Sequence, residues 1–344
     1  MDKVNLKDLY VEEIEKILYD INQEKYRAKQ IFKWIYRGVC SYEDMTDIPI
    51  QLREQLSQNL FLSCLKVLNV QRSIDGTAKY LFELSDGNAI ESVLMKYKYG
   101  YSACISTQVG CKMGCKFCAS TQCGFVRNLT AGEIVDQIIS IQKDADIKIS
   151  KIVFMGIGEP LENYQNTIKA LKLLNHQLGL NVGYRNMSVS TCGLVPAILN
   201  LAEEKLPVTL SISLHAPNNE IRNKIMPINK KYNINELLDA CRKYTNSTKR
   251  RISFEYVMIA DVNDSEKNAV ELASKIRGML AHINIIQLNP TTDQGLARSS
   301  ANNVKKFIDI LRKKGIETTL RRELGNEIDA ACGQLRLKHK RHKE

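Results

Sequence analysis

The stretch Cys111-Lys112-Met113-Gly114-Cys115-Lys116-Phe117-Cys118 places three cysteines at the spacing C-x3-C-x2-C. Thiolates gathered on such a short loop select soft inorganic centres, chiefly iron–sulfur clusters and zinc. A closed structural zinc site and an ordinary electron-transfer cluster each take four protein ligands. A cubane cluster held by three cysteines keeps one iron open to another molecule. The stretch therefore predicts an iron–sulfur centre with one open position, held by Cys111, Cys115 and Cys118.

Zinc is the competing interpretation of the same cysteines, because metal sites inferred from cysteine spacing include false positives. A zinc knuckle would use Cys104 or Cys123 as its fourth ligand. The spacing, with the aromatic Phe117 directly before the third cysteine, instead resembles the signature of the radical S-adenosylmethionine (SAM) enzymes. In that superfamily the open iron binds the amino and carboxylate groups of the methionine moiety of SAM.

The composition is that of a globular protein in a reducing compartment. The chain has 344 residues, of which 44% are hydrophobic and 25% charged, and its length predicts about two domains. Ten cysteines in a chain with this much core favour metal-binding or catalytic thiols over a secreted disulfide scaffold. The first residues form no signal peptide and no run is long enough to span a bilayer, so we expect a cytoplasmic protein without a membrane partner.

The net charge of +11 favours an anionic partner, most simply nucleic acid. The densest basic run, 336–343, is either a solubilising end or an arm that binds phosphates. An early segment, 26–37, mixes aromatic residues with four cations and could stack on RNA. An aromatic stripe on a helix more often belongs to the core, so this segment adds little to the case for RNA.

The order of patterns along the chain predicts an α/β protein with four parts. Residues 1–62 read as a helical accessory domain that binds RNA, and 63–98 as a β-strand extension or linker. Residues 99–322 alternate strand and helix, which argues for a parallel sheet with right-handed crossovers. Residues 323–344 form a C-terminal cysteine loop and a basic tail.

Six strands beyond the cysteine loop are too few for a closed eight-stranded barrel, so we predict an open, partial (β/α)6 barrel with its site at the carboxyl ends of the strands. The expected strands after the first, at 101–107, are 151–156, 187–191, 208–214, 252–259, 283–288 and 316–321. Expected helices lie at 164–176, 195–204, 233–244, 265–279 and 301–314. Another begins at the capping box Thr130–Glu133.

Polar and glycine motifs follow four of these strands. Because the carboxyl ends of parallel strands meet at one rim, their side chains could together bind the ribose, carboxylate and adenine of a ligand. The residues are Gly158, Glu159, Ser190, Ser213, Leu214, His215 and Asn289. Each motif alone could be routine capping, and Gly158-Glu159-Pro160 also looks like the motif with which radical SAM enzymes bind the SAM amine.

Two further residues are ambiguous on sequence alone. In the alternating strand 89–95, Glu91 shares a face with Val93 and Met95, as either an edge charge or a base with a raised pKa. Cys332, between Ala331 and Gly333, is an unhindered nucleophile or a buried structural thiol. For both residues the structural interpretation is the simpler one on these patterns alone.

The chain resembles the RlmN family essentially from end to end. The resemblance is carried by the stretches 104–118, 124–133, 158–161, 213–217 and 328–335. Members of that family are radical SAM methyltransferases that act on C2 of an adenosine in 23S ribosomal RNA, at the peptidyl-transferase centre, and in tRNA, at the adenosine 3′ of the anticodon. The resemblance implies a [4Fe–4S] cluster on the three cysteines, two molecules of SAM per turnover and an electron donor such as flavodoxin or ferredoxin. We expect a monomer.

The resemblance also implies a role for each remaining cysteine. One SAM would methylate Cys332, and cleavage of a second would give a 5′-deoxyadenosyl radical that takes a hydrogen from the new S-methyl group. The resulting methylene radical would add to C2 of adenine, which is too electron-poor to accept a methyl cation directly. Cys104 would then release the tethered product by forming a disulfide with Cys332, and Glu91 would remove the C2 proton.

Two cysteines near the motifs, Cys123 and Cys192, have no part in the family's chemistry, and we treat them as incidental. Within the same enzyme class, a Cfr-like adenine-C8 methyltransferase would carry a similar cluster and similar paired cysteines. In a different class, a non-catalytic RNA-binding protein with structural zinc would carry the same charge and cysteines. The segments after the strands look more like those of the C2 enzymes.

Overall fold

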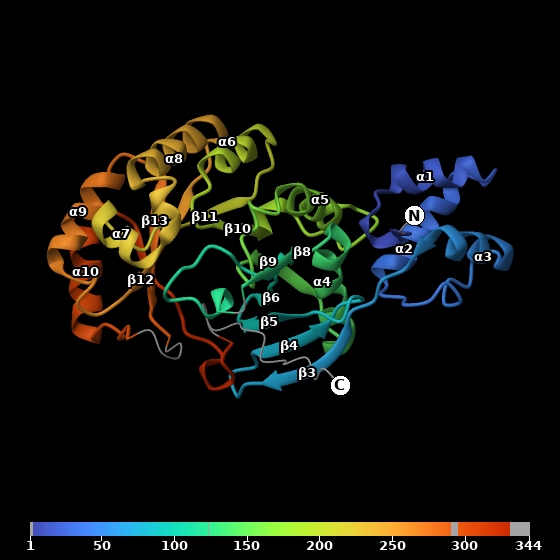
Figure 1. The fold of residues 1–344 in the computed structure, drawn as a ribbon, viewed down its shortest axis with the longest axis horizontal. Coiled ribbons are helices and arrows are strands. Elements are labelled where there is room, and N and C mark those ends of the chain that lie inside the picture. Colours follow the sequence, from blue (N-terminus) through green and yellow to red (C-terminus); the bar gives the residue numbers. More distant parts are fainter. Residues whose placement is uncertain (1–2, 123, 290–294, 331–344) are drawn as a thin grey trace.

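A computed structural model of the chain describes residues 3–122, 124–289 and 295–330. Its core is a ten-stranded sheet with the order β14-β13-β12-β11-β10-β9-β6-β5-β4-β3 (Figure 1). The strands are β3 (Lys66–Arg72), β4 (Ala78–Glu83), β5 (Ala89–Tyr97), β6 (Gly100–Cys104), β9 (Ile149–Phe154), β10 (Met187–Thr191), β11 (Thr209–Ser213), β12 (Ile252–Met258), β13 (Ala281–Gln287) and β14 (Thr318–Leu320). This sheet confirms the predicted α/β partial barrel.

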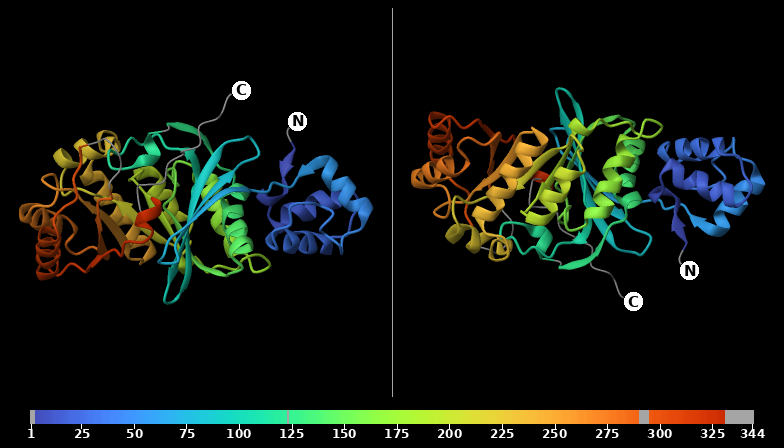
Figure 2. Two further views of the ribbon diagram at one scale, coloured as in Figure 1. Left: turned by 90° about the horizontal axis from the view of Figure 1, so that it is seen from below. Right: turned by 90° about the horizontal axis from the view of Figure 1, so that it is seen from above.

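Strands β6 and β9–β14 are parallel, and β5, β4 and β3 continue the sheet in antiparallel fashion from β6. Helices on the outside cover the parallel strands (Figure 2). They are α4 (Ala131–Ala145), α5 (Tyr164–Asn175), α6 (Val195–Glu203), α7 (Asn219–Ile225), α8 (Ile234–Thr248), α9 (Glu266–Ile276) and α10 (Ala301–Lys313). All seven residues of β12 are buried, as expected for a parallel strand covered on both faces.

A separate lobe of three helices precedes the sheet (Figure 2). These are α1 (Val11–Asp20), α2 (Tyr26–Tyr36) and α3 (Ile50–Asn59), joined by the short parallel pair β1 (Val4–Asn5) and β2 (Leu60–Phe61). Buried residues of α2 face the core, whereas Tyr26 is exposed, so the aromatic stripe is divided between core and surface. A disulfide between Cys40 and Cys64, which the sequence did not suggest, joins the loop after α2 to the segment after β2.

A buried ion pair and two hydrogen bonds attach the N-terminal part of the chain to α4 of the barrel. Lys7 lies in a short 3-10 helix (Leu6–Asp8), and its ammonium is 2.5 Å from an Asp136 carboxylate oxygen on α4, with both side chains almost fully buried. The other carboxylate oxygen of Asp136 accepts a hydrogen bond from the Leu65 amide, at 3.0 Å. Asp8 accepts one from the Gly132 amide, at 2.6 Å, in the first turn of α4. A buried ion pair that also has its hydrogen bonds satisfied fixes orientation well.

The β3–β4 turn holds the C-terminal segment, which we define as residues 321–330. The Asp75 carboxylate accepts from the Gly325 amide at 2.9 Å, and the Glu327 carboxylate accepts from the Ile74 amide at 3.1 Å. Lys79 on β4 donates to the Asp329 carbonyl at 3.4 Å. The segment therefore lies against the antiparallel part of the sheet.

None of the helices in the described parts of the chain is both long and apolar enough to cross a membrane.

Candidate active site

The cysteine loop leaves the small antiparallel pair β7 (Gln108–Gly110) and β8 (Phe125–Asn128) and rests on the turn after α7. The Lys116 amide donates to the Ile225 carbonyl at 3.0 Å, and the Cys111 amide donates to the Gly124 carbonyl at 2.9 Å. A side chain at Gly114, whose φ is +71°, would meet the ring of Pro227 at 3.4 Å. The backbone of the loop is thus fixed from two sides.

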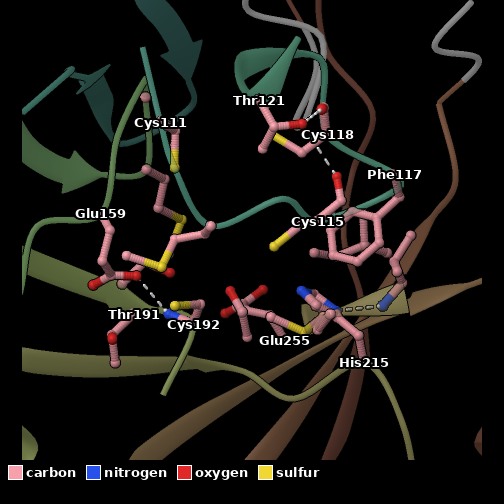
Figure 3. A pocket seen from close by; sticks show the side chains of 18 of the residues that line it. Cys111, Cys115, Phe117, Cys118, Thr121, Glu159, Thr191, Cys192, His215 and Glu255 are labelled. Carbon is pink, nitrogen blue, oxygen red and sulfur yellow. Dashed lines mark hydrogen bonds between the residues drawn. The ribbon is translucent and has the colours of Figure 1, made fainter. Parts of the chain in front are cut away.

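All three cysteines of the motif line one pocket at the carboxyl ends of the strands (Figure 3). Glu159, His215 and Asn289 line the same pocket, together with Gly158, Ser190 and Ser213. Leu214 does not: its side chain is fully buried in the core, and only its neighbours face the pocket. The structure therefore brings together all but one of the described residues that the strand-end motifs suggested as a ligand site.

The donor set fits a soft inorganic group. Three cysteine sulfurs border one pocket, and thiolates are ligands that iron–sulfur clusters and zinc prefer. The residues present could therefore hold the iron–sulfur cluster that the cysteine spacing predicts.

Burial controls the protonation of these thiols. It raises the pKa of Cys111 to about 12 and that of Cys115 well above its ordinary value. A buried thiol in apolar surroundings remains neutral and inert, whereas coordination to a metal requires the thiolate. Binding of a metal group here must therefore release protons.

Glycines let the chain after β9 pack closely against residues 105–108, which lead into the cysteine loop. A Cβ at Gly158, whose φ is +108°, would lie 2.6 Å from the Gln108 side chain, and one at Gly156 would lie 2.7 Å from the Ile105 backbone. The Glu159 amide donates to Gln108 at 2.8 Å. The Glu159 carboxylate accepts from the amides of Leu161 and Cys192, at 3.0 and 2.7 Å, which ties β9 to β10. The side chains of Cys192 and Thr191 also form hydrogen bonds with this carboxylate.

His215 is a neutral, oriented imidazole. Burial lowers its pKa to about 3, and its Nδ1 accepts a hydrogen bond from the Val257 amide at 3.0 Å. The ring packs edge-on against Phe117 of the cysteine loop, with ring centres 4.7 Å apart. Its backbone φ of +56° is the left-handed conformation that turns the chain away from the end of β11.

Sequence reasoning missed Arg222, a fully buried cation behind the pocket. Its guanidinium donates to the carbonyls of Cys192, Ser213 and Leu214, at 2.6, 3.2 and 3.2 Å. It also donates to the Asn229 side chain at 3.1 Å. Arg222 therefore joins α7, on which the cysteine loop rests, to the ends of β10 and β11. No motif marks it, because its partners are mostly backbone carbonyls.

Replacing Arg222 by leucine should lower the free energy of unfolding by about 3 kcal/mol or more, because several buried acceptors lose their donor at about 1–3 kcal/mol each. Urea unfolding of the purified variant would measure the loss. Arg242→Leu is the matched control, since Arg242 is exposed on α8, and it should change stability by less than about 1 kcal/mol. Equal effects of the two substitutions would contradict the role given to Arg222.

Glu91 and Cys104 lie beside the C-terminal segment. Glu91 is 5% exposed on β5, with Lys79 3.9 Å from its carboxylate. Cys104, at the end of β6, is buried in a small apolar cluster with Val93, Met95, Ile157 and Leu324, against which Ala330 packs. Cys332 and Cys123 lie outside the described residues.

Other pocket residues had weak sequence signals. Met155 directly follows β9 and Met226 directly follows α7, and both look like ordinary core residues. Glu255 had the clearest signal, as a carboxylate within the apolar strand β12; it accepts hydrogen bonds from Ser253 and Asn284, both at 2.8 Å. Arg321 lies 3.8 Å from Glu255 and also faces the pocket.

The family model of the radical SAM superfamily matches residues 105–273, and that of the ribosomal RNA large subunit methyltransferase N-terminal domain matches residues 4–62. A protein of Alkaliphilus oremlandii named "Probable dual-specificity RNA methyltransferase RlmN" is 52% identical over 340 residues, which cover 98% of this chain and 99% of that protein. The chain belongs to the RlmN family. A protein of Clostridium novyi with the same name is 51% identical, with the same coverage of each chain.

A solved crystal structure has the same fold over nearly the whole chain. The radical SAM methyltransferase from Sphaerobacter thermophilus superposes with a TM-score of 0.93 and 45% identity, covering 97% of this chain and 99% of that one. This RlmN family member is therefore a radical SAM methyltransferase, and its superfamily implies a [4Fe–4S] cluster and SAM. The predicted family and enzyme class are confirmed.

Proposed function

We propose that this enzyme methylates C2 of an adenosine in 23S ribosomal RNA and in tRNA, with Cys332 carrying the methyl group as S-methylcysteine. The observation that carries the proposal is the position of the C-terminal segment. Its last described residue, Ala330, packs against the cluster that contains Cys104, and Arg321, the first residue of the segment, lines the cysteine-lined pocket. Two residues span at most about 7 Å of chain, which is the reach from Ala330 to Cys332.

Adenine C2 is electron-poor, so transfer of a methyl cation has no nucleophile to accept it. When bound, the cluster and SAM supply a carbon-centred radical after one-electron reduction. Cys111, Cys115 and Cys118 would hold the cluster, and the residues at the ends of β9–β11 and β13 would orient SAM, among them Gly158, Glu159, Ser190, Ser213, His215 and Asn289. Two molecules of SAM would be used per turnover.

The remaining steps belong to the chain's own side chains. Glu91 would take the proton from C2 while the adenine is joined through a methylene group to the sulfur of Cys332, and the adduct would return one electron to the oxidised cluster to become a closed-shell thioether. Lys79, close to both Glu91 and the Asp329 carbonyl, would hold the base beside the C-terminal segment. The Cys104 thiolate would attack the Cys332 sulfur. The S–S bond forms as the carbon–sulfur bond breaks, and the carbon, after taking a proton, leaves as the methyl group.

The RNA substrate is supported by the net charge of +11 and by the names of the relatives. Single-stranded or loop adenosines fit best, because C2 must be unstacked before a side chain can reach it. We place the enzyme in the cytoplasm, as a monomer that takes electrons from a flavodoxin or ferredoxin.

Anaerobic purification followed by absorption spectroscopy tests the cofactor. The wild-type protein should be brown, with iron–sulfur charge-transfer absorption that air bleaches, and Cys115→Ala should lose most of it. Cys241→Ala is the matched control, because Cys241 is a buried free cysteine of α8 outside the pocket. A colourless protein with stoichiometric zinc would refute the proposal.

Nucleoside mass spectrometry of RNA treated with the reduced enzyme and SAM tests the position of methylation. We expect 2-methyladenosine in 23S ribosomal RNA and in tRNA. Formation of 8-methyladenosine would instead identify a C8 enzyme and would contradict the assignment of C2.

A further inference from the structure

A second hollow lies inside the barrel, on the side away from the cysteine loop. Its lining includes Lys151, Ser188 and Thr209, which lie near the starts of β9, β10 and β11. The cysteine-lined pocket, by contrast, is lined by residues at and beyond the ends of those strands. The volume of the hollow is about 270 Å³, far more than a single water molecule needs. Barrel interiors are normally filled by bulky branched side chains. The hydroxyl-bearing residues in this layer leave the space open.

The lining of the hollow is cationic. Lys151, Arg185 and Arg321 all line it, and none of its lining residues is acidic. In the described parts of the chain, Lys151 and Arg185 form no ion pair with a carboxylate, while Arg321 lies 3.8 Å from Glu255. The three cations and one nearby carboxylate leave a net positive site. Ser102, Ser188 and Thr209 add hydroxyl donors, so the site has the chemistry of a phosphate binder.

One wall of the hollow is aromatic. The rings of Tyr97 and Tyr99 lie parallel, with an angle of 7° between them and their centres 4.9 Å apart. Tyr99 is 57% exposed, and the Lys151 ammonium sits 3.9 Å from the centre of its ring. Tyr97 and the Lys151 ammonium cover the two faces of the Tyr99 ring, so its exposed edge is the aromatic surface that a nucleic-acid base can contact beside the cations.

The hollow adjoins both the cysteine-lined pocket and the C-terminal segment. Arg321 lines the hollow and also lines the cysteine-lined pocket. Met95 and Tyr97 line the hollow and also border the C-terminal segment, where Met95 packs with Cys104. A nucleotide chain that presents one base near Cys104 could place a neighbouring phosphate here.

We propose that this hollow binds a phosphate of the RNA substrate, held by Lys151 and Arg185, with an adjacent base against the exposed edge of Tyr99. The proposal rests on the proposed function only in taking RNA as the substrate. The hollow would hold the RNA strand that enters the barrel, and Lys151 and Arg185 would be positioning residues for that strand.

The test is binding of fluorescently labelled hexaadenylate to the full-length enzyme, with saturating SAM and no reductant, from 50 to 200 mM salt. Lys151→Gln combined with Arg185→Gln should weaken binding about tenfold at the lowest salt. It should also reduce the slope of log K against log salt by about 0.7 to 1.4, as one or two phosphate contacts are lost. Tyr99→Ser should weaken binding about fivefold.

Control variants distinguish loss of this site from a general loss of positive charge and from loss of folding. Lys243→Gln with Lys313→Gln removes two exposed helix cations, lowers the net charge equally and should leave the salt slope unchanged. Lys151→Arg with Arg185→Lys keeps both charges and should restore most of the slope. Unchanged melting temperatures would show that the glutamine variant is folded.

Competition by small molecules tests the nature of the ligand. Adenosine 5′-monophosphate should displace the oligonucleotide better than either adenosine or inorganic phosphate. Equal competition by inorganic phosphate would overturn a nucleotide site, and a wild-type salt slope in the glutamine variant would overturn the phosphate contact. Both results are obtained without methyl transfer, so they stand apart from failure of the C2 chemistry.

Discussion

Cys332→Ala is expected to abolish methylation of RNA completely, with no change in the iron–sulfur absorption. In the proposed reaction the Cys332 sulfur carries the methyl carbon that joins adenine, so no other side chain can substitute for it. Mass spectrometry of the protein as isolated should show one additional methyl group in wild type and none in the variant. Methylated nucleosides would be quantified in parallel with the absorption spectrum.

Cys241→Ala provides the control for this experiment, because it removes a thiol that lies outside the pocket. It should retain methylation within about twofold, since a small truncation costs stability but touches no reacting atom. Normal turnover by Cys332→Ala would eliminate the relay through that sulfur. Loss of the cluster in that variant would instead point to a structural or ligand role for Cys332.

Cys104→Ala is expected to trap RNA on the protein. Without the thiolate that attacks the Cys332 sulfur, the carbon–sulfur bond to the adduct has no route to break. A denaturing gel should show a covalent protein–RNA species approaching one RNA per enzyme, and ribonuclease digestion followed by mass spectrometry should place a modified adenosine on Cys332.

Cys192→Ala is the matched comparison, because Cys192, like Cys104, is a buried cysteine without a disulfide, and it borders the pocket but is assigned no chemical step. It should release methylated product without accumulating the adduct. Untethered product from Cys104→Ala would contradict the resolving role. An adduct that also accumulates in Cys192→Ala would show that Cys192 takes part in release.

The parallel sheet could be predicted because its strands are apolar and regularly separated by helices. Expected and observed strands overlap throughout, with β10 identical at 187–191 and β9 displaced by two residues to Ile149–Phe154. The position of the pocket could also be predicted, because the carboxyl ends of parallel strands meet at one rim and polar motifs follow those ends. The short helix α7 was missed because its polar sequence, Asn219–Ile225, carries little apolar periodicity.

The long-range polar contacts could not be predicted. Arg222 binds carbonyl groups, which every residue has, so no sequence pattern identifies its partners. The buried Lys7–Asp136 pair spans two domains, and each residue alone looks like a surface charge. The family resemblance supplied the roles of Glu91, Cys104 and Cys332, which composition and periodicity left ambiguous. Of these, the structure places Glu91 and Cys104 near the C-terminal segment.

The register of β5 determines where Glu91 and its neighbours lie. This register against β4 and β6 sets Glu91 opposite Leu81 and Val93 opposite Cys104. A shift of one residue would turn each side chain to the other face of the sheet and carry the carboxylate away from its neighbours. Because the proposed roles of Glu91 and Cys104 depend on this register, insertion of one residue within β5 should abolish methylation and leave the iron–sulfur absorption unchanged, whereas longer turns at either end of β5 should be tolerated.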